Sequence, residues 1–258
     1  DQCMTCHNSN AKFVLGVKTH QLNGDMEYHL VNGVRNQIQY LEEQGIFSNK
    51  VGDPDNYIKA YPIDDENADL ELRVRSYLDA NCSSCHRLGG VSNVTMDLRY
   101  ALPLPLQGIV GISTKSEVSP SNSIIVKPGD HAASELWIRD ASETTNKMPP
   151  LARRLTDDVY LEKLAEWIDG LGEDAGDIDK IFVYPNPSSG YVSVQFRRTW
   201  EPPFEITVYS ISGQLVGSYV SETHTFDLDL STQTSGIYLL EINYNEERQI
   251  RKIVLKNN

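Results

Sequence analysis

Two copies of one short motif, C-x-x-C-H, constrain this chain more than any other feature of its 258 residues. One copy lies at the start of the chain and the other lies near residue 84. Together the two copies use all four cysteines. The motif residues are Cys3, Cys6 and His7 in the first copy and Cys82, Cys85 and His86 in the second.

The C-x-x-C-H pattern is typical of a covalent attachment site for c-type haem. Two thiols one helical turn apart can both reach the vinyl groups on one edge of a porphyrin. The histidine that follows can then point its imidazole at the iron from the same turn. We therefore expect two covalently attached haem c groups, with Cys3, Cys6, Cys82 and Cys85 as attachment residues and His7 and His86 as iron ligands.

Other chemistries use a C-x-x-C pair. Such a pair can be half of a zinc site, and two pairs together could supply an all-cysteine tetrahedral zinc site. It can also be a redox dithiol. Neither alternative requires a histidine directly after the second cysteine, twice over, and no thioredoxin-like βαβ pattern surrounds the motifs. The haem interpretation is therefore favoured.

The net charge of the chain is −13, and it is unevenly spread. Residues 181–258 carry 6 basic and 8 acidic side chains, so the remaining −11 lies in residues 1–180. This balance argues against nucleic acid as a partner and favours redox partners with a basic docking surface. No run approaches the roughly 18 to 20 apolar residues that a membrane helix needs, so no transmembrane segment is expected.

Covalent haem attachment takes place outside the cytoplasm, so the chain should be exported. The first motif begins almost at the start of the chain. We therefore expect an export signal and further sequence upstream.

Helical periodicity is visible in four stretches of residues 1–172. The first should run from Asp25, as N-cap, to about Gln44, with Gly45 ending it. Its apolar stripe is Val31, Val34, Ile38 and Leu41.

The second helix should cover about Ala68 to Ala80 and lead to Cys82, and a short third one should cover Ala132 to Ala141. The fourth should run from Thr156, as N-cap, to Leu171. Its expected buried side chains are Leu161, Leu164, Trp167, Ile168 and Leu171. Residues 91–128 are rich in proline and should form loops, with one small hairpin around 109–112 and 123–126.

The order of helix, C-x-x-C-H, loops, a methionine before two prolines and an amphipathic helix resembles a class I cytochrome c over residues 66–172. The resemblance implies that His86 is the proximal iron ligand and Met148 the distal one. Met148 comes much later in the chain than His86, in Met148-Pro149-Pro150. Core packing is the alternative role of Met148, and His131 is the rival distal ligand.

Further short stretches belong to the same pattern. They are residues 6–7, 13–16, 19, 21–23, 81–90, 96–99, 127–130 and 148–151. This set is similar to a family of exported dihaem proteins whose function is poorly defined. The resemblance implies that a longer β-rich region precedes the first motif.

The distal ligand of the first haem is open. His20, Met26 and His29 are candidates by position, as are an upstream residue, a partner chain or no ligand. If the first haem has two histidine ligands, electrons should run from it to the haem bound by Met148, because methionine ligation raises the haem potential.

The texture of the sequence changes after residue 172. Residues 173–180 are acidic and are expected to form a linker. A haem segment at 1–65 and a cytochrome c-like domain at 66–172 should precede the linker, and a β domain at 181–258 should follow it. In the β domain, apolar and polar residues alternate in several short stretches separated by turn signals, which predicts a small β-sandwich. The stretches are Tyr191 to Phe196, Glu205 to Ile211 and Phe226 to Leu230.

The matching motifs in this domain are residues 183–187, 190, 208–214, 235–240 and 251–256. They resemble the C-terminal sorting domain of the type IX secretion system of Bacteroidota. The resemblance implies contact with the secretion machinery and a final location at the outer-membrane surface or in the medium, after passage through the periplasm.

The expected fold is therefore multi-domain, with a mainly α, cytochrome c-like haem region followed by an all-β sandwich. The expected function is electron transfer outside the cell between two bound haems and redox partners, without catalytic residues. Two alternatives remain open. The chain could be a peroxidase-like haem enzyme or the electron outlet of a larger oxidoreductase, or a subunit of a surface filament that associates with itself through haem contacts.

Overall fold

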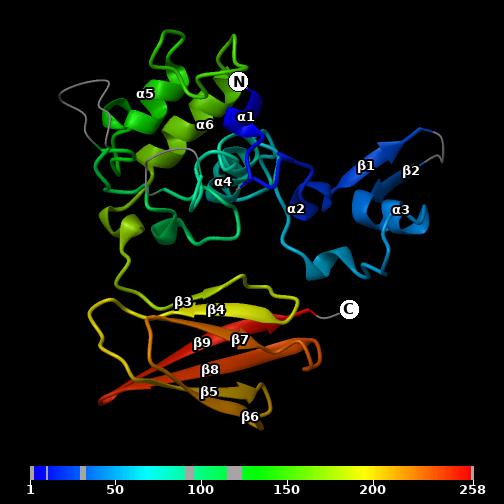
Figure 1. Ribbon diagram of the computed structural model, residues 1–258, viewed down its shortest axis with the longest axis vertical. Coiled ribbons are helices and arrows are strands. Elements are labelled where there is room, and N and C mark those ends of the chain that lie inside the picture. The colour runs from blue at the N-terminus through cyan, green and yellow to red at the C-terminus, as the bar shows by residue number, and fades with distance from the viewer. Residues whose placement is uncertain (1–2, 10, 30–32, 91–95, 115–123, 257–258) are drawn as a thin grey trace. The chain divides into compact units, whose positions relative to one another are not determined.

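The computed structural model describes residues 3–9, 11–29, 33–90, 96–114 and 124–256 (Figure 1). The chain divides into two compact units. The first unit contains Asp1–Val17 and Ala60–Asp177, and the second contains Lys18–Lys59 and Ile178–Asn258.

Helices and helical turns build the first unit. They are α1 (Cys3–Cys6), α4 (Leu70–Asn81), η2 (Leu104–Gln107), η3 (His131–Ala133), α5 (Glu135–Ala141), α6 (Asp158–Asp169) and η4 (Glu173–Gly176). The two longest, α4 and α6, pack together. The rings of Tyr77 on α4 and Tyr160 on α6 stack with their centroids 3.7 Å apart, and Leu78 and Leu164 are fully buried in the same cluster.

The sequence predicted α4 and α6 well. Each helix begins just after an aspartate whose side chain accepts a backbone N–H: Asp69 from Leu72 at 3.2 Å, and Asp157 from Tyr160 at 3.1 Å. The N-cap of α6 is therefore Asp157 and not Thr156, whose hydroxyl donates to the carboxylate of Asp158 instead.

Two other predictions for this unit need correction. The helix expected over 132–141 is split into η3 and α5. The small hairpin is reduced to isolated bridges, one parallel between Val110 and Val126 and one antiparallel between Ser113 and Ile124. Ser123, its expected first residue on the returning strand, lies outside the described residues.

The helix expected from Asp25 to Gln44 is wrong. In its place are an antiparallel hairpin, β1 (Asp25–Tyr28) and β2 (Gly33–Asn36), and a shorter helix, α3 (Gln37–Glu43). Gly33 disfavours helix by about 1 kcal/mol relative to alanine. Asn36 caps α3 by accepting the N–H of Ile38 at 2.9 Å. The helix can therefore begin only after Asn36.

The apolar stripe that predicted the long helix does not form. Ile38 is 1% exposed, whereas Val34 lies on β2 and is 67% exposed. Val31 lies outside the described residues. The predicted end is confirmed, because Gly45 has φ +70° directly after the helix and its N–H donates to the Glu42 carbonyl. The same part of the chain also contains α2 (Thr19–Leu22) and η1 (Pro54–Asn56).

Residues 182–255 form the two sheets of a β-sandwich. One sheet has the order β3-β4-β7, and the other has the order β6-β5-β8-β9, with antiparallel pairing throughout. The strands are β3 (Phe182–Tyr184), β4 (Tyr191–Gln195), β5 (Phe204–Ser210), β6 (Leu215–Ser221), β7 (Thr225–Asp229), β8 (Gly236–Tyr244) and β9 (Glu247–Leu255).

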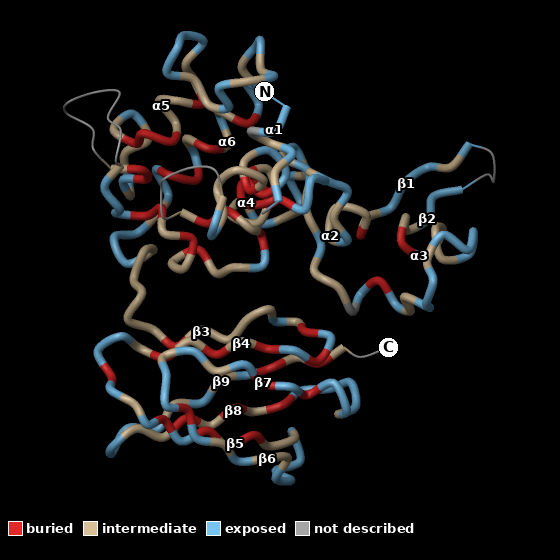
Figure 2. The backbone as a smooth tube through the Cα atoms, in the orientation of Figure 1, coloured by how far each residue is buried: buried red, intermediate tan, exposed pale blue. Residues whose placement is uncertain are grey.

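Alternation of buried and exposed residues on β4 and β5 confirms the predicted period of two. Both sheets contribute to one core, which contains Val194 of β4, Leu228 of β7, Val208 of β5 and Leu240 of β8 (Figure 2). The all-β C-terminal domain expected from the sequence is therefore confirmed.

The expectation of a mainly α, cytochrome c-like region before this domain is wrong. The described part of residues 3–180 combines short helices, 3-10 turns, the β1–β2 hairpin and long irregular segments, so the chain as a whole is mixed α/β. The β1–β2 hairpin, which replaces the first part of the helix expected over 25–44, explains part of the difference.

Candidate functional site

The turn that follows α4 presents the second C-x-x-C-H motif. The backbone N–H of Cys82 donates to the Leu78 carbonyl at 2.9 Å, which continues the helical hydrogen bonding past Asn81. The N–H groups of Cys85 and His86 then both donate to the Cys82 carbonyl, at 3.1 and 2.9 Å. These hydrogen bonds hold Cys82 and His86 one turn apart.

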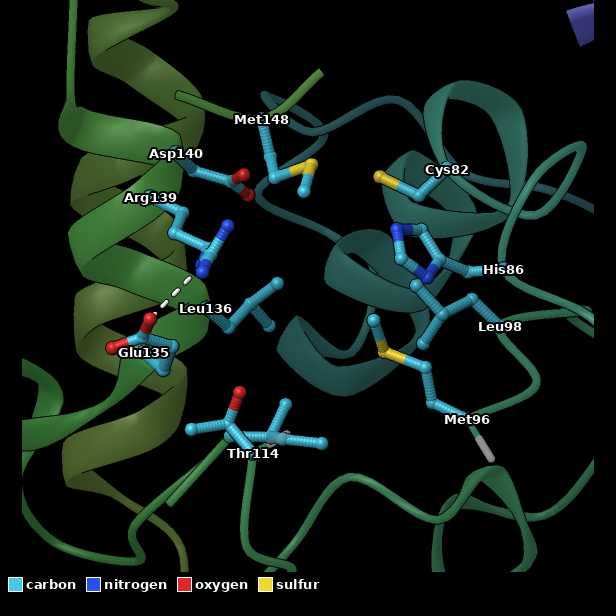
Figure 3. Close-up of a pocket in the computed structure, with 11 residues that line it drawn as sticks. Cys82, His86, Met96, Leu98, Thr114, Glu135, Leu136, Arg139, Asp140 and Met148 are labelled. Atoms are coloured by element: carbon cyan, nitrogen blue, oxygen red, sulfur yellow. Dashed lines mark hydrogen bonds and ion pairs between the residues drawn. The ribbon is translucent and has the colours of Figure 1, made fainter. Parts of the chain in front are cut away.

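A largely apolar cavity opens beside this turn (Figure 3). Its empty space is about 700 Å³, part of it open to solvent. Segments distant in sequence bring Cys82, His86 and Met148 into its wall. The thioether of Met148 lies across the cavity from the imidazole of His86 (Figure 3). The remaining lining residues are Met96, Leu98, Thr114, Ile125, Glu135, Leu136, Arg139 and Asp140.

A second cavity of about 640 Å³ adjoins the first. The two share Cys82, Asp140 and Met148, and the aromatic pair Tyr77 and Tyr160 lines the second. The side chains of Cys82 and Met148 therefore line both cavities.

His86 is held in a form that suits a metal ligand. Its Nδ1 atom is buried and has no hydrogen-bond partner in the described part of the chain. Its carbonyl accepts the N–H of Leu98 at 2.9 Å, which fixes the backbone. Burial, and then the positive charge of Arg139, lower the pKa of His86 to about 4. The imidazole is neutral near pH 7, which is the form that binds iron.

Charged side chains of α5 form the polar end of the cavity. The guanidinium of Arg139 donates from Nε to Oε1 of Glu135 at 2.9 Å, and these side chains are 17% and 3% exposed. The carboxylate of Asp140 accepts the Tyr160 hydroxyl at 2.7 Å. Burial raises the pKa of Asp140 to about 7, against the hydrogen bond from Tyr160 and the charge of Arg153, which both lower it.

Sequence reasoning did not identify these charged residues. The i,i+4 spacing of Glu135 and Arg139 signals an ion pair, but nothing in the pattern signals that the pair is buried. In the sequence, Met96 was noted only within a stretch that resembles a known family and was not a candidate site residue. It nevertheless supplies a second thioether to the cavity wall (Figure 3).

The first motif lies on α1, which contains Cys3 and Cys6. The ring of His7 forms a hydrogen bond through Nδ1 with the Phe13 carbonyl at 2.8 Å. This contact places the proton on Nδ1 and leaves the Nε2 lone pair for a ligand, an orientation common among metal-bound histidines.

Both motifs belong to the first unit. Burial, followed by the neighbouring Cys6, raises the pKa of the Cys85 thiol. Cys85 is not among the residues that line the cavity, whereas Cys82 is.

The proposed distal ligands of the first haem lie in the other compact unit. His20 is on α2, Met26 is on β1 with 49% of its surface exposed, and the side chain of His29 is 86% exposed and faces Glu27. The rival for the second haem, His131, pairs through Nδ1 with Asp169 at 2.7 Å and does not line the cavity.

The four cysteines do not gather into one zinc site. Within the described ranges, no three or more His, Cys, Asp or Glu side chains form a group that could hold a metal ion. In the same ranges, no helix has the length and apolarity required to span a bilayer.

Comparison with protein families gives one match, to the "Secretion system C-terminal sorting domain", over residues 182–256. This match confirms the resemblance of the C-terminal domain to a type IX secretion sorting domain. It indicates export and a location at the cell surface or outside the cell. Among curated proteins, none matches the chain.

Several solved structures match part of the chain. One is PorZ, described as an essential surface component of the type IX secretion system of Porphyromonas gingivalis, at 16% identity, a TM-score of 0.26 and coverage of 33% of this chain and 12% of PorZ. Another is a DUF3244 protein from Bacteroides vulgatus with an immunoglobulin-like β-sandwich, at 11% identity, a TM-score of 0.26 and coverage of 30% and 83%. Similarity at this level carries no further conclusion.

The expected membership of an exported dihaem cytochrome family, with a class I cytochrome c module at 66–172, is wrong. The matching family model covers residues 182–256 and none of the residues on which that resemblance was based. Within those residues, the helix expected over 132–141 is also split into η3 and α5. What remains for the part of the chain before the sorting domain is the chemistry of the two motifs and of the cavity.

Proposed function

We propose that this chain binds haem covalently at its two C-x-x-C-H motifs and transfers electrons outside the cell. One observation carries the proposal. Cys82 and His86 of the second motif and Met148, from a distant part of the sequence, line one apolar cavity. A thiol, an imidazole and a thioether are the groups that attach a haem and ligate its iron.

Cys82, His86 and Met148 line the cavity and fit such a group. Cys82 would form one thioether link, His86 would be one iron ligand and Met148 the other, whereas Cys85, the second proposed attachment residue, does not line the cavity. The buried, unpartnered Nδ1 of His86 and the neutral state of its ring agree with this role in the described part of the chain. When bound, haem supplies a reversible one-electron change at iron.

The surrounding side chains would set the properties of that site. Leu98, Ile125 and Leu136 make part of the cavity wall apolar. A methionine ligand favours a higher potential than a second histidine does. Arg139 brings a positive charge to the cavity wall, and Asp140 brings a group whose pKa lies near 7.

At the first motif, Cys3 and Cys6 would hold the second haem and His7 would ligate its iron. The hydrogen bond between His7 Nδ1 and the Phe13 carbonyl supports this assignment. We assign no distal ligand to this haem, because His20, Met26 and His29, the candidates by position, belong to the other compact unit.

The sorting domain supports the place and one partner of this activity. Export to the cell surface or the medium implies that the secretion machinery handles the chain. We extend this to the outer-membrane surface, reached through the periplasm. With a net charge of −13, the protein would dock redox partners that present basic surfaces.

Optical and resonance Raman spectra of the purified protein test the proposal. We expect two haems per chain in a pyridine haemochrome assay and, in the oxidised protein, a near-infrared band from iron–methionine ligation. Met148→Leu should remove that band, and the matched variant Met96→Leu should keep it. A band that survives Met148→Leu and disappears in Met96→Leu would assign the ligand to Met96.

A further inference from the structure

Two tyrosines stack in the wall of the second cavity. Tyr77 of α4 and Tyr160 of α6 have ring planes 7° apart and centroids 3.7 Å apart. Both line the cavity that Cys82, Asp140 and Met148 also line. Neither tyrosine lines the neighbouring cavity that we propose for haem. The pair therefore lies beside the proposed haem site without being part of it.

Each hydroxyl of this pair donates to a carboxylate. Tyr160 donates to Oδ2 of Asp140 at 2.7 Å in a buried hydrogen bond, and Tyr77 donates to Oδ2 of Asp157 at 3.1 Å in an exposed one. A carboxylate can take up the phenolic proton outright, whereas a backbone carbonyl cannot, because it is a far weaker base. The contact between Tyr160 and Asp140 is therefore a short route for a proton.

Burial decides which chemistry is open to Tyr160. The residue is almost fully buried, and the ring of Tyr77 covers one of its faces. Burial, and then the charge of Asp140, raise the pKa of the Tyr160 hydroxyl well above its ordinary value, so the phenolate is disfavoured. An electron can cross the short gap to Tyr77 by tunnelling, whereas molecules that quench a radical by contact cannot reach the buried ring. The site therefore favours loss of an electron together with a proton.

We propose that Tyr160 is a redox-active residue, which gives one electron to an external oxidant through the stacked ring of Tyr77 and gives its proton to Asp140. The phenolic O–H bond breaks, an O–H bond forms on the carboxylate of Asp140, and a neutral phenoxyl radical remains on Tyr160. The electron acceptor is a strong one-electron oxidant such as a peroxyl radical, which becomes a peroxide anion. This activity goes beyond the proposed function and requires no haem.

Flash photolysis of the full chain, produced without haem-attachment machinery, tests the proposal. A ruthenium(III) polypyridyl complex, generated by light with a sacrificial electron acceptor, serves as the oxidant and becomes ruthenium(II). At pH 8 the carboxyl of Asp140, with a pKa of about 7, is ionised. We expect a long-lived tyrosyl radical, detected by optical absorption and electron paramagnetic resonance, that forms more slowly in heavy water. No such radical, or equal rates in ordinary and heavy water, would overturn the proposal.

Two phenylalanine variants serve as a matched pair. Tyr160 and Tyr238 are buried to a similar extent, with 3% and 5% of their surface exposed. The hydroxyl of Tyr238 donates to the Thr234 carbonyl at 2.8 Å, which cannot take up the proton. Tyr160→Phe should abolish the long-lived radical, whereas Tyr238→Phe should leave its yield unchanged. An unchanged yield in Tyr160→Phe, or an equal loss in both variants, would contradict the assignment.

Two further variants test the routes of the proton and of the electron. Asp140→Asn keeps the size of the side chain and removes the proton acceptor, so the yield of the radical should fall. Tyr77→Leu removes the stacked ring, so the radical should form more slowly. A radical unchanged in yield and rate in either variant would overturn the corresponding route. The comparison in heavy water uses the wild-type chain and stands even if a variant does not fold.

The outcome is independent of the proposed function, because the chain in this experiment carries no haem. All the variants keep the four cysteines, so competition from thiols for the oxidant is the same in each. A radical on Tyr160 in a chain that never acquires haem would support this proposal and leave the haem function to its own test.

Discussion

At the scale of single residues, the cavity combines soft ligands with a buried acid. Met148 faces His86 across an apolar space, and Asp140 lies on its polar wall, bonded to Tyr160 (Figure 3). The proposed ligands His86 and Met148 could be anticipated from the motif and from the methionine before two prolines. The buried charges could not, because burial of Glu135, Arg139 and Asp140 depends on how α5 packs on α6.

Replacing Met148 separates ligation from packing. Met148→Leu nearly conserves volume, so the free energy of unfolding should change by less than about 1.5 kcal/mol. The reduction potential of the haem at His86 should fall, because the methionine ligand that raises it is gone. Potentiometric titration measures the shift, and an unchanged potential would contradict ligation by Met148.

Asp140 should make the stability of the haem-free chain depend on pH. Its pKa is about 7 in the folded chain, against 3.8 as the ordinary value, because the carboxyl is buried. The folded state therefore holds a proton that the unfolded state has lost between these pH values. The free energy of unfolding should be greatest below about pH 4. It should fall by at most about 4 kcal/mol in total as the pH rises toward 7, and then level off.

Urea denaturation at pH 5 and pH 8 measures this dependence. In Asp140→Asn, the carboxyl is absent and the fall in stability between the two pH values should shrink. An equal fall in the wild type and the variant would show that other groups cause it.

At the scale of elements, the sequence predicted the helices and strands that depend on local signals. It did not predict the element that depends on contacts between distant residues. The helices α4 and α6 have capping aspartates and apolar periodicity, and the strands alternate cleanly. Residues 25–44 also show a helical stripe, yet Gly33 and the capping side chain of Asn36 favour a hairpin followed by a short helix. A hairpin pairing is a contact between residues, which periodicity alone does not reveal.

The N-cap of α6 can be located by mutation. Asp157→Ala should lower the free energy of unfolding by about 1 kcal/mol, because the Tyr160 N–H loses its acceptor. Thr156→Ala, the control at the neighbouring position, should change it by less than about 0.5 kcal/mol. A larger loss of stability in Thr156→Ala than in Asp157→Ala, measured by chemical denaturation, would show that Thr156 is the N-cap.

The packing of α6 gives a second element-scale test. Leu164 is fully buried, whereas Val159 on the same helix is half exposed. Leu164→Ala should destabilise the first unit by about 2–5 kcal/mol, and Val159→Ala by less than about 0.5 kcal/mol. Circular dichroism during urea denaturation measures the loss of stability in each variant. Similar losses in the two variants would contradict the orientation of α6 that buries Leu164 and exposes Val159.

At the scale of the whole molecule, the sequence was more informative about the C-terminal domain than about the region before it. The C-terminal β-sandwich matches a secretion sorting domain over residues 182–256, which confirms its identification from short motifs. The region before it holds the two motifs, and its assignment to a known family is wrong even though residues of the second motif line a suitable cavity. Short motifs with fixed spacing identified the sorting domain and pointed to the cysteines that we propose for haem attachment, but did not predict the fold of the region that holds them.

The central claim is that both motifs carry covalent haem. Intact mass spectrometry of the denatured protein, produced with haem-attachment machinery, tests it most directly, because only covalently bound haem survives denaturation. We predict the mass of the chain plus two haems, reduced to one haem when Cys82 and Cys85 are both replaced by serine. A chain mass without any haem, from cells that load a control c-type protein fully, would contradict the account.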